Sequence, residues 1–154
     1  GLAGHIYGAA GLWGGDIEPG ARYTMWDALR FRSGAQMQHL REFALSEGAR
    51  YQELVPDADL VYPNRTRDVR GNEGWASCAA TPEKGLYMIY FEAGCAPATV
   101  RGLRYGGAYR ARWFDPRTGE WREAPDLVAD AFCEAMLPPL PTQQDWALVL
   151  TLIE

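Results

Sequence analysis

The sequence predicts a mainly β protein in which an antiparallel β-sandwich of about six to eight strands follows a segment of loop and helix. From about residue 58, apolar residues alternate with a period of two in short runs bounded by turn-forming residues. Before that point they recur at the helical period. The 154 residues are 47% apolar, which is enough for one hydrophobic core of ordinary size.

The longer helix of the first segment is predicted over residues 33 to 47. Ser33 stands at the expected N-cap with Gln36 at capping-box spacing, and Gly48 follows in the position that commonly ends a helix. His39 lies on a flank of this helix and is expected at the surface. The apolar face, which needs a partner to lie on, carries Met37, Leu40, Phe43 and Ala44.

A shorter helix is predicted just before it, over residues 24 to 31. The spacing of its apolar residues places Trp26 and Leu29 on one face, which we expect to point inward. Both helices thus need a neighbouring surface to cover.

Two stretches have the pattern of central strands. Residues 85 to 91, GLYMIYF, are apolar on both faces, as in a strand that is buried on both sides of a sheet. Residues 145 to 153, DWALVLTLI, have the same pattern. Both are expected near the middle of a sheet.

A hairpin is predicted within YRARWFDPRTGEW, residues 109 to 121. Pro116 suits position i+1 of a type I turn, and Gly119 can adopt the left-handed conformation that closes a four-residue loop. Asp115 should then lie opposite Glu120. Alternation places Tyr109, Ala111 and Trp113 on the core face, and Arg110, Arg112, Phe114 and Trp121 on the other.

Composition excludes several classes of partner. The net charge is -5 and the basic residues are scattered, so no nucleic acid is expected. Cys78, Cys95 and Cys133 lie far apart without a ligand pattern, and no glycine loop carries a phosphate-binding lysine, so no metal or other cofactor is expected. No apolar run is long enough for a membrane span, and no signal segment is recognisable, so the compartment is not predicted.

Five segments and their order carry a resemblance to a known family. In sequence they are GHIYGAAGLW, WDALRFRSGAQMQHLREF, YQELVPD, YRARWFDPRTGEW and DWALVL. In this order they resemble the C-terminal part of the apiosidase-like glycoside hydrolases, which have a TIM barrel followed by a small β-sandwich named for collagen binding. The resemblance implies that residues 1–57 form the end of a (β/α)8 barrel, with its last βα unit. It implies that residues 58–154 form a C-terminal accessory sandwich.

The resemblance also implies a place for the opening stretch. A segment like GHIYG is similar to the last barrel strand, near the face where the active sites of barrel enzymes lie. There His5 would donate a hydrogen bond to a sugar hydroxyl, and Tyr7 or Trp13 would offer a ring to the sugar. The alternative is that His5 bonds to nearby backbone and that both rings pack internally.

Hydrolysis of a glycoside normally requires two carboxylates that face each other across the scissile bond. The resemblance implies that this pair belongs to earlier barrel strands, which this chain lacks. Asp16 and Glu18 lie beside Pro and Gly and have the character of turn residues, and Asp115 and Glu120 flank the predicted hairpin turn. We therefore expect no catalytic residue in this chain.

Three functions of different classes remain as expectations. The first is a non-catalytic accessory region of a glycoside hydrolase-like protein, packed on a catalytic barrel. The second is a module that binds a polysaccharide or a collagen-like protein, with Phe114, Trp121 and Trp75 as exposed rings. The third is a structural cap that binds nothing.

Self-association is a further expectation of the barrel-end interpretation. A barrel end without its neighbours would expose apolar side chains and strand edges, which tend to find partners. The side chains concerned are Ile6, Leu12, Met37, Leu40 and Phe43.

Overall fold

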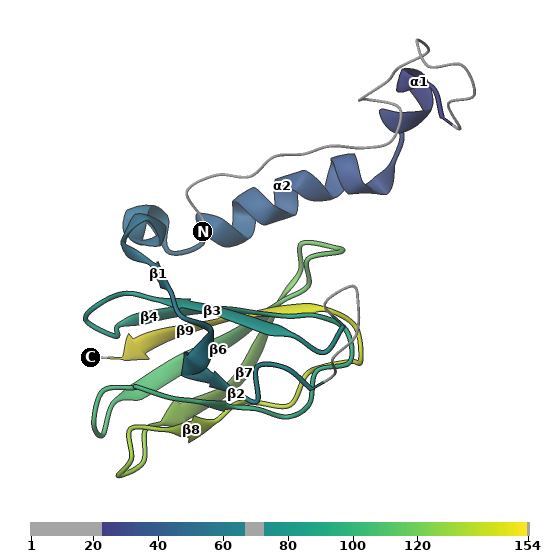
Figure 1. The fold of residues 1–154 in the computed structure, drawn as a ribbon. Helices are drawn as coiled ribbons and strands as arrows, with labels where there is room; N and C mark the ends of the chain where they lie inside the picture. Colours follow the sequence, from purple (N-terminus) through teal and green to yellow (C-terminus); the bar gives the residue numbers. More distant parts are fainter. Residues whose placement is uncertain (1–22, 67–72, 154) are drawn as a thin grey trace.

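The computed structural model describes residues 23–66 and 73–153 (Figure 1). The helical elements are α1 (Met25–Ala28), α2 (Arg32–Ala44) and the 3₁₀ turns η1 (Gly48–Glu53) and η2 (Ala58–Leu60). The strands are β1 (Val55–Pro56), β2 (Val61–Tyr62), β3 (Ala76–Ala80), β4 (Leu86–Phe91), β5 (Thr99–Val100), β6 (Ala108–Phe114), β7 (Trp121–Val128), β8 (Ala135–Met136) and β9 (Trp146–Ile153).

The strands form an antiparallel sandwich of two sheets. The large sheet has six strands in the order β1-β3-β4-β9-β6-β7, and the small sheet has three in the order β2-β5-β8. The prediction of a mainly β fold, with a sandwich after a short helical segment, is confirmed. The described residues form nine strands, whereas six to eight were predicted. Strands β1, β2, β5 and β8 are only two residues long, and strands this short leave little periodicity in the sequence.

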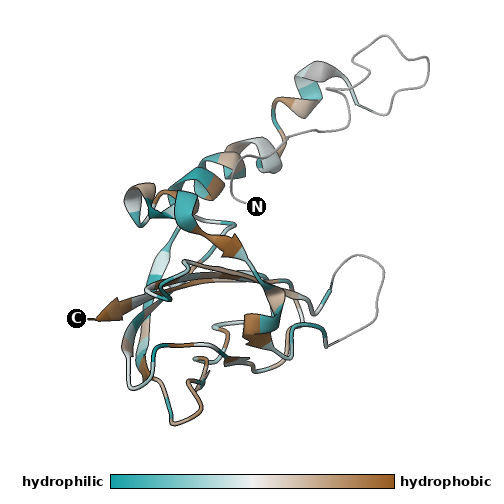
Figure 2. Cartoon of the chain, turned by 60° about the vertical axis from the view of Figure 1, so that its left-hand side comes forward, coloured by the Kyte–Doolittle hydropathy of each residue, from teal (hydrophilic) through white to brown (hydrophobic). Residues whose placement is uncertain are grey.

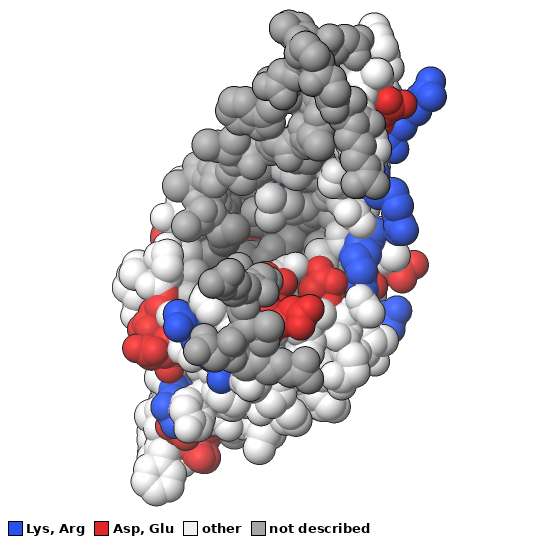
Figure 3. All heavy atoms as spheres, turned by 45° about the vertical axis from the view of Figure 1, so that its right-hand side comes forward, with Lys and Arg blue, Asp and Glu red and all other residues white. Residues whose placement is uncertain are grey.

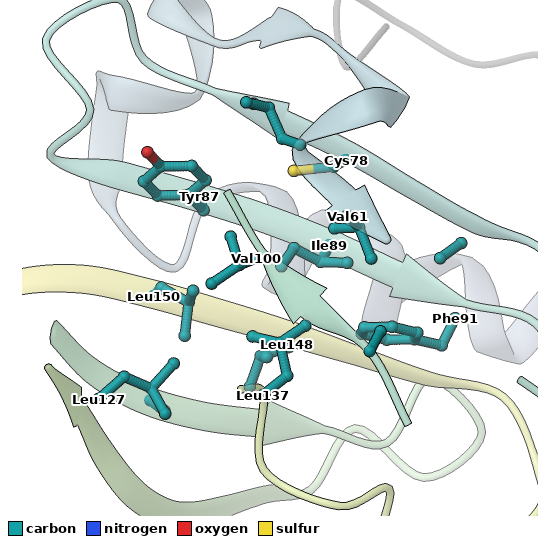
Figure 4. Packing of buried hydrophobic residues seen from close by; sticks show 14 of the residues in the cluster. Val61, Cys78, Tyr87, Ile89, Phe91, Val100, Leu127, Leu137, Leu148 and Leu150 are labelled. Carbon is teal, nitrogen blue, oxygen red and sulfur yellow. The ribbon is translucent and has the colours of Figure 1, made fainter. Parts of the chain in front are cut away.

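The main hydrophobic core lies between the two sheets (Figure 4). Tyr87, Ile89 and Phe91 point into it from β4, and each is at most 1% exposed. The small sheet closes the core from the other side with Val61 and Val100. Removing this much apolar surface from water is the main favourable contribution to the stability of such a domain.

The hairpin between β6 and β7 has the predicted geometry. The Asp115 backbone N–H donates to the Glu120 carbonyl at 2.9 Å, and the Gly119 N–H donates to the Asp115 carbonyl at 2.8 Å. Gly119 has a φ of 77°, which only glycine adopts without strain. The predicted core face is also confirmed, with Tyr109, Ala111 and Trp113 in the main core.

The ends of α2 differ from the prediction. The helix begins at Arg32, so Ser33 lies inside it, and the N-cap residue Phe31 makes no side-chain cap hydrogen bond. At the other end the helix stops at Ala44, and Gly48, with a φ of 63°, begins η1 instead. No helix in the described ranges is long and apolar enough to cross a membrane.

The reciprocal capping box occurs in α1. The Thr24 hydroxyl accepts from the Asp27 N–H at 3.2 Å, and the Asp27 carboxylate accepts from the Thr24 N–H at 3.0 Å. The expectation that Trp26 and Leu29 point inward is wrong, because each is 63% exposed. The reason is that α1 lies beyond the far end of α2, away from both sheets (Figure 1).

The large sheet begins before residue 58, the predicted domain boundary. Val55 and Pro56 of β1 pair with Ala80 and Ala79 of β3. The strand that follows the helical segment is therefore already part of the sandwich.

Candidate functional site

A second apolar cluster lies on the outer face of the large sheet, beneath α2. Its buried members are Phe43, Leu86, Met88, Phe114, Ala147 and Val149. Because side chains alternate along a strand, β4 and β9 bury one set in the main core and the other set here. The predicted burial of these two strands on both faces is thus confirmed.

Phe43 attaches α2 to the sheet. Its ring stacks on Phe114 at a centroid distance of 5.5 Å and on Trp121 at 6.3 Å. Figure 2 shows α2 as mainly hydrophilic, and Phe43 is its one buried side chain among the described residues. The predicted apolar face of the helix is therefore only partly buried, since Leu40 remains 36% exposed.

An arginine on β6 connects the same face to the turn after α2. The Arg112 guanidinium donates to the carboxylate of Glu47 and lies 4.6 Å from the centroid of the Trp121 ring. The guanidinium therefore covers one face of the indole and fixes the end of the helix by an ion pair.

The hairpin turn meets the middle of α2. A Cβ atom on Gly119 would collide with the ring of His39, so only glycine lets the turn approach the helix this closely. The Gln36 side-chain amide donates to the Arg117 carbonyl at 3.4 Å. The prediction that His39 lies at the surface is wrong, because its side chain is 13% exposed between the helix and the turn.

Two hollows flank Phe43 on the outer face, and both also touch Tyr90. The larger, of about 350 Å³, is lined further by Leu40, Phe114, Pro116 and Ala147. The smaller, of about 210 Å³, is lined further by Pro56, Ser77 and Met88. They mark apolar sheet surface that α2 leaves uncovered. We call this surface, with Phe43 at its centre, the outer-face site.

A hydrogen-bonded network borders the outer-face site at the hairpin end. Arg117 donates two hydrogen bonds of 2.8 Å to the Asp115 carboxylate, and these hold the pKa of Asp115 below its usual value. The Tyr90 hydroxyl donates to Asp145 at 2.8 Å, and burial raises the pKa of Tyr90. Burial and the charge of Asp145 raise the pKa of Glu92. Asp115 and Asp145 both face Arg117, so neither is an unpaired acid or base.

The three rings proposed for ligand binding do not form one platform. Phe114 is 1% exposed beneath Phe43, so the expectation that it lies on the binding surface is wrong. Trp121 is partly buried against Phe114 and Arg112. Trp75 precedes β3, three strands away from β6, with the Arg65 guanidinium 4.1 Å from its centroid.

The candidate sugar contacts His5, Tyr7 and Trp13 lie outside the described residues, as do Asp16 and Glu18. The sequence did predict that Arg112 and Phe114 share the outer face. What it missed is the partner of that face, Phe43 and Glu47, which lie far away along the chain.

Charged side chains are unevenly distributed on the face shown in Figure 3. Lys and Arg follow one edge of the helical part of the chain, and Asp and Glu gather on the sandwich below it. Within residues 23–66 and 73–153, no three His, Cys, Asp or Glu side chains converge as a metal site would require.

Comparison with protein families identifies the sandwich. The family described as "Putative collagen-binding domain of a collagenase" matches residues 55–151. The chain belongs to this family. The match begins at β1 and ends in β9, so the collagen-binding-domain family comprises both sheets and leaves α1, α2 and η1 outside. No curated protein matches the chain.

Two solved structures share the fold of the sandwich and also of part of the chain outside it. A structure described as a glycoside hydrolase has a TM-score of 0.71 and 19% identity, over 96% of this chain and 33% of its own. A glycoside hydrolase of family 5 from Bacteroides vulgatus has a TM-score of 0.63 and 16% identity, over 87% of this chain and 27% of its own. The chain thus spans about a third of the length of these enzymes, and the similarity extends into the helical segment.

Proposed function

We propose that this chain is the C-terminal accessory region of a glycoside hydrolase-like protein, and that it packs on a catalytic barrel without being catalytic itself. Family membership and the fold shared with longer glycoside hydrolases support the accessory role. The outer-face site is the surface that we propose for the barrel.

The observation that carries this proposal is the second apolar cluster. In an antiparallel sandwich the outer face of a sheet commonly faces water and is polar. Here β4 and β9 place Met88, Ala147 and Val149 on that face, where each is at most 4% exposed. The hollows on either side of Phe43 would receive side chains from neighbouring elements of a barrel, of which α2 would be the last helix.

The state of the carboxylates supports the non-catalytic part of the proposal. A glycosidase acid or base needs a carboxyl group that is free to face the sugar. Asp115 accepts from Arg117 with both oxygens, and Asp145 accepts from Tyr90 and lies 3.7 Å from the same guanidinium. Both carboxylates are thus engaged in holding the hairpin end together.

The first test reads the coding sequence upstream of Gly1. We expect an open frame in phase, of about 250 codons or more, with the βα alternation of a barrel. A stop codon directly upstream would contradict the proposal. Turnover of aryl glycosides or plant polysaccharides by the pure 154-residue chain would contradict its non-catalytic part.

The second test uses two neighbouring residues of α2 in the longer protein. Leu40 lines the larger hollow, whereas Arg41 is exposed and lines neither. We expect Leu40→Asp to separate the thermal unfolding of barrel and sandwich into two transitions, and Arg41→Asp to leave one. Equal behaviour of the two variants would argue against docking through this face.

A binding module is the second candidate, favoured by the description of the family as a collagen-binding domain. Its ring candidates are Trp121 and Trp75, which are partly exposed. If Trp121→Ala lowers the melting temperature but binds polysaccharide or collagen in titration no more weakly than the native chain, Trp121 is a packing residue only.

A further inference from the structure

Two aromatic side chains protrude from the side of the sandwich remote from α2. Phe132, between β7 and β8, is 83% exposed, and Tyr105, between β5 and β6, is 81% exposed. Backbone hydrogen bonds of 2.9 Å join their loops, from Leu103 N–H to the Cys133 carbonyl and from Ala129 N–H to the Gly107 carbonyl. Figure 1 shows these two loops side by side at the lower left.

The loop that carries Tyr105 is held by two buried tyrosines. The Tyr87 hydroxyl donates to the Gly102 carbonyl at 2.6 Å. The Tyr109 hydroxyl donates to the Lys84 carbonyl at 2.7 Å and accepts from the Arg104 N–H at 3.0 Å. The residue before Tyr105 is therefore fixed to the core of the sandwich.

The loop that carries Phe132 is organised by one carboxylate. Asp130 accepts from the Phe132 N–H at 2.8 Å and from the Glu134 N–H at 2.9 Å. Its own N–H donates to the Glu134 carbonyl at 2.9 Å, and the Cys133 N–H donates to the Asp130 carbonyl at 3.0 Å. The turn is closed on itself, and Phe132 projects from it.

We propose that Tyr105 and Phe132 form a contact surface for a neutral saccharide chain. Loops held in this way lose little backbone entropy when a ligand binds. The negatively polarised face of an aromatic ring attracts the C–H groups on the face of a sugar. The hydroxyl groups of that sugar can then bond to the polar groups around the loops.

The size of the surface favours a saccharide over a protein. A fully buried aromatic side chain contributes about 150–250 Å² of surface, so two rings contribute at most about 500 Å². A stable protein interface uses about 800 Å² on each partner. Two separate rings instead suit sugars along a chain, each ring stacking on one of them.

This surface does not depend on docking of a barrel. The outer-face site lies under α2 on the large sheet, whereas the loops adjoin the small sheet on the opposite side (Figure 1). Both surfaces can thus be occupied together, and failure of one proposal leaves the other standing.

The experiment titrates the 154-residue chain with neutral β-1,4-linked hexasaccharides of glucose, xylose and mannose. We expect saturable calorimetric binding of at least one hexasaccharide and no measurable binding of its monosaccharide. Tyr105→Ala and Phe132→Ala should each weaken the affinity about fivefold to tenfold, within the range of stacking contributions. Tyr105→Phe should retain binding, because the ring and not the hydroxyl makes the contact.

Tyr62 supplies the matched control. It is 59% exposed, but the Arg101 guanidinium lies 4.5 Å from its centroid and occupies a ring face. Tyr62→Ala should leave saccharide affinity unchanged. Absence of binding by all three hexasaccharides overturns the proposal, as does equal binding by the alanine variants. Binding of a triple-helical Gly-Pro-Pro peptide in place of saccharide, lost in Phe132→Ala, would also overturn it.

Discussion

The Asp115 carboxylate accepts hydrogen bonds from Arg117 with both of its oxygens in the hairpin turn. It is 5% exposed, and its bonds to Arg117 lower its pKa from the ordinary value of 3.8. We expect Asp115→Asn to lower the free energy of unfolding at neutral pH by about 1–3 kcal/mol, the contribution typical of a hydrogen bond to a charged group. Urea unfolding of both proteins measures the difference.

The pH dependence follows from the direction of that shift. A carboxyl group with a lowered pKa in the folded state contributes its full stability above 3.8, and this contribution is lost as the pH falls through the folded value. The difference between native and Asp115→Asn chains should thus shrink on acidification. Glu120→Gln, an exposed acid in the same turn, is the control and should change little. A constant difference down to pH 2 (about two units below the ordinary Asp pKa) would contradict this assignment.

The contact between α2 and the hairpin depends on Gly119. Both Gly119 and Gly106 have positive φ values, 77° and 65°, but only a Cβ on Gly119 would meet His39. Gly106→Ala should cost about 1–2 kcal/mol for the left-handed backbone alone. Gly119→Ala should cost more, because the ring of His39 must also move.

A double-mutant cycle isolates the helix contact. His39→Ala removes the obstructing ring, so Gly119→Ala in that background should cost no more than Gly106→Ala does. Chemical denaturation of the four proteins measures the coupling. If the cost of Gly119→Ala is the same with and without His39, the helix does not rest on the turn in solution.

Truncation of Phe43 tests whether this one side chain holds α2 on the large sheet. Phe43→Ala removes the stack on Phe114 and Trp121, and truncation of a buried Phe costs about 3 kcal/mol. Because the main core contains no residue of α2, we expect the helix to detach while the sandwich stays folded. Hydrogen exchange should show amide protection in α2 falling about a hundredfold, with β4 and β9 unchanged.

The control for this experiment is Leu45→Ala, since Leu45 follows α2 and is 40% exposed. It should leave protection of α2 nearly unchanged. Loss of protection throughout the sandwich in Phe43→Ala would mean that helix and sheets unfold as one unit.

The sequence was most informative about elements with strong local signals. Two-faced apolar runs predicted β4 and β9, and Pro116 with Gly119 predicted the hairpin, because period and turn chemistry are local properties. Helix ends were less predictable. Ser33 was predicted as an N-cap, but the reciprocal box forms at Thr24, at the start of a helix for which no cap was predicted.

The candidate site was harder to predict because its partners are distant in sequence. Alternation correctly placed Phe114 opposite the main core, but exposure was the wrong inference. Its cover is Phe43, from an element seventy-one residues earlier (114 minus 43). A pattern along one strand gives the direction of a side chain and contains no information on which element approaches it.

For the molecule as a whole, we expect self-association. Trp26 and Leu29 are each 63% exposed on α1, and exposed apolar side chains of this size favour association. Sedimentation velocity should show an average mass that rises with protein concentration. The double variant Trp26→Ser, Leu29→Ser should shift the protein toward monomer.

Tyr105→Ala is the control for association, because Tyr105 is also exposed but its loop, between β5 and β6, lies on the side of the sandwich away from the helices. It should leave the concentration dependence unchanged. A single mass at all concentrations in the native chain would contradict self-association through α1.

The two-sided burial of the large sheet bears on how such a domain can move between proteins during evolution. A β-sandwich with polar outer faces can be joined to many partners through a linker. This one would lose stability in such an exchange, because cutting at residue 58 would remove β1 and expose Met88 and Val149 to water. Gene fusions that preserve the domain should therefore carry α2 with it, so that helix and sandwich are inherited as one unit.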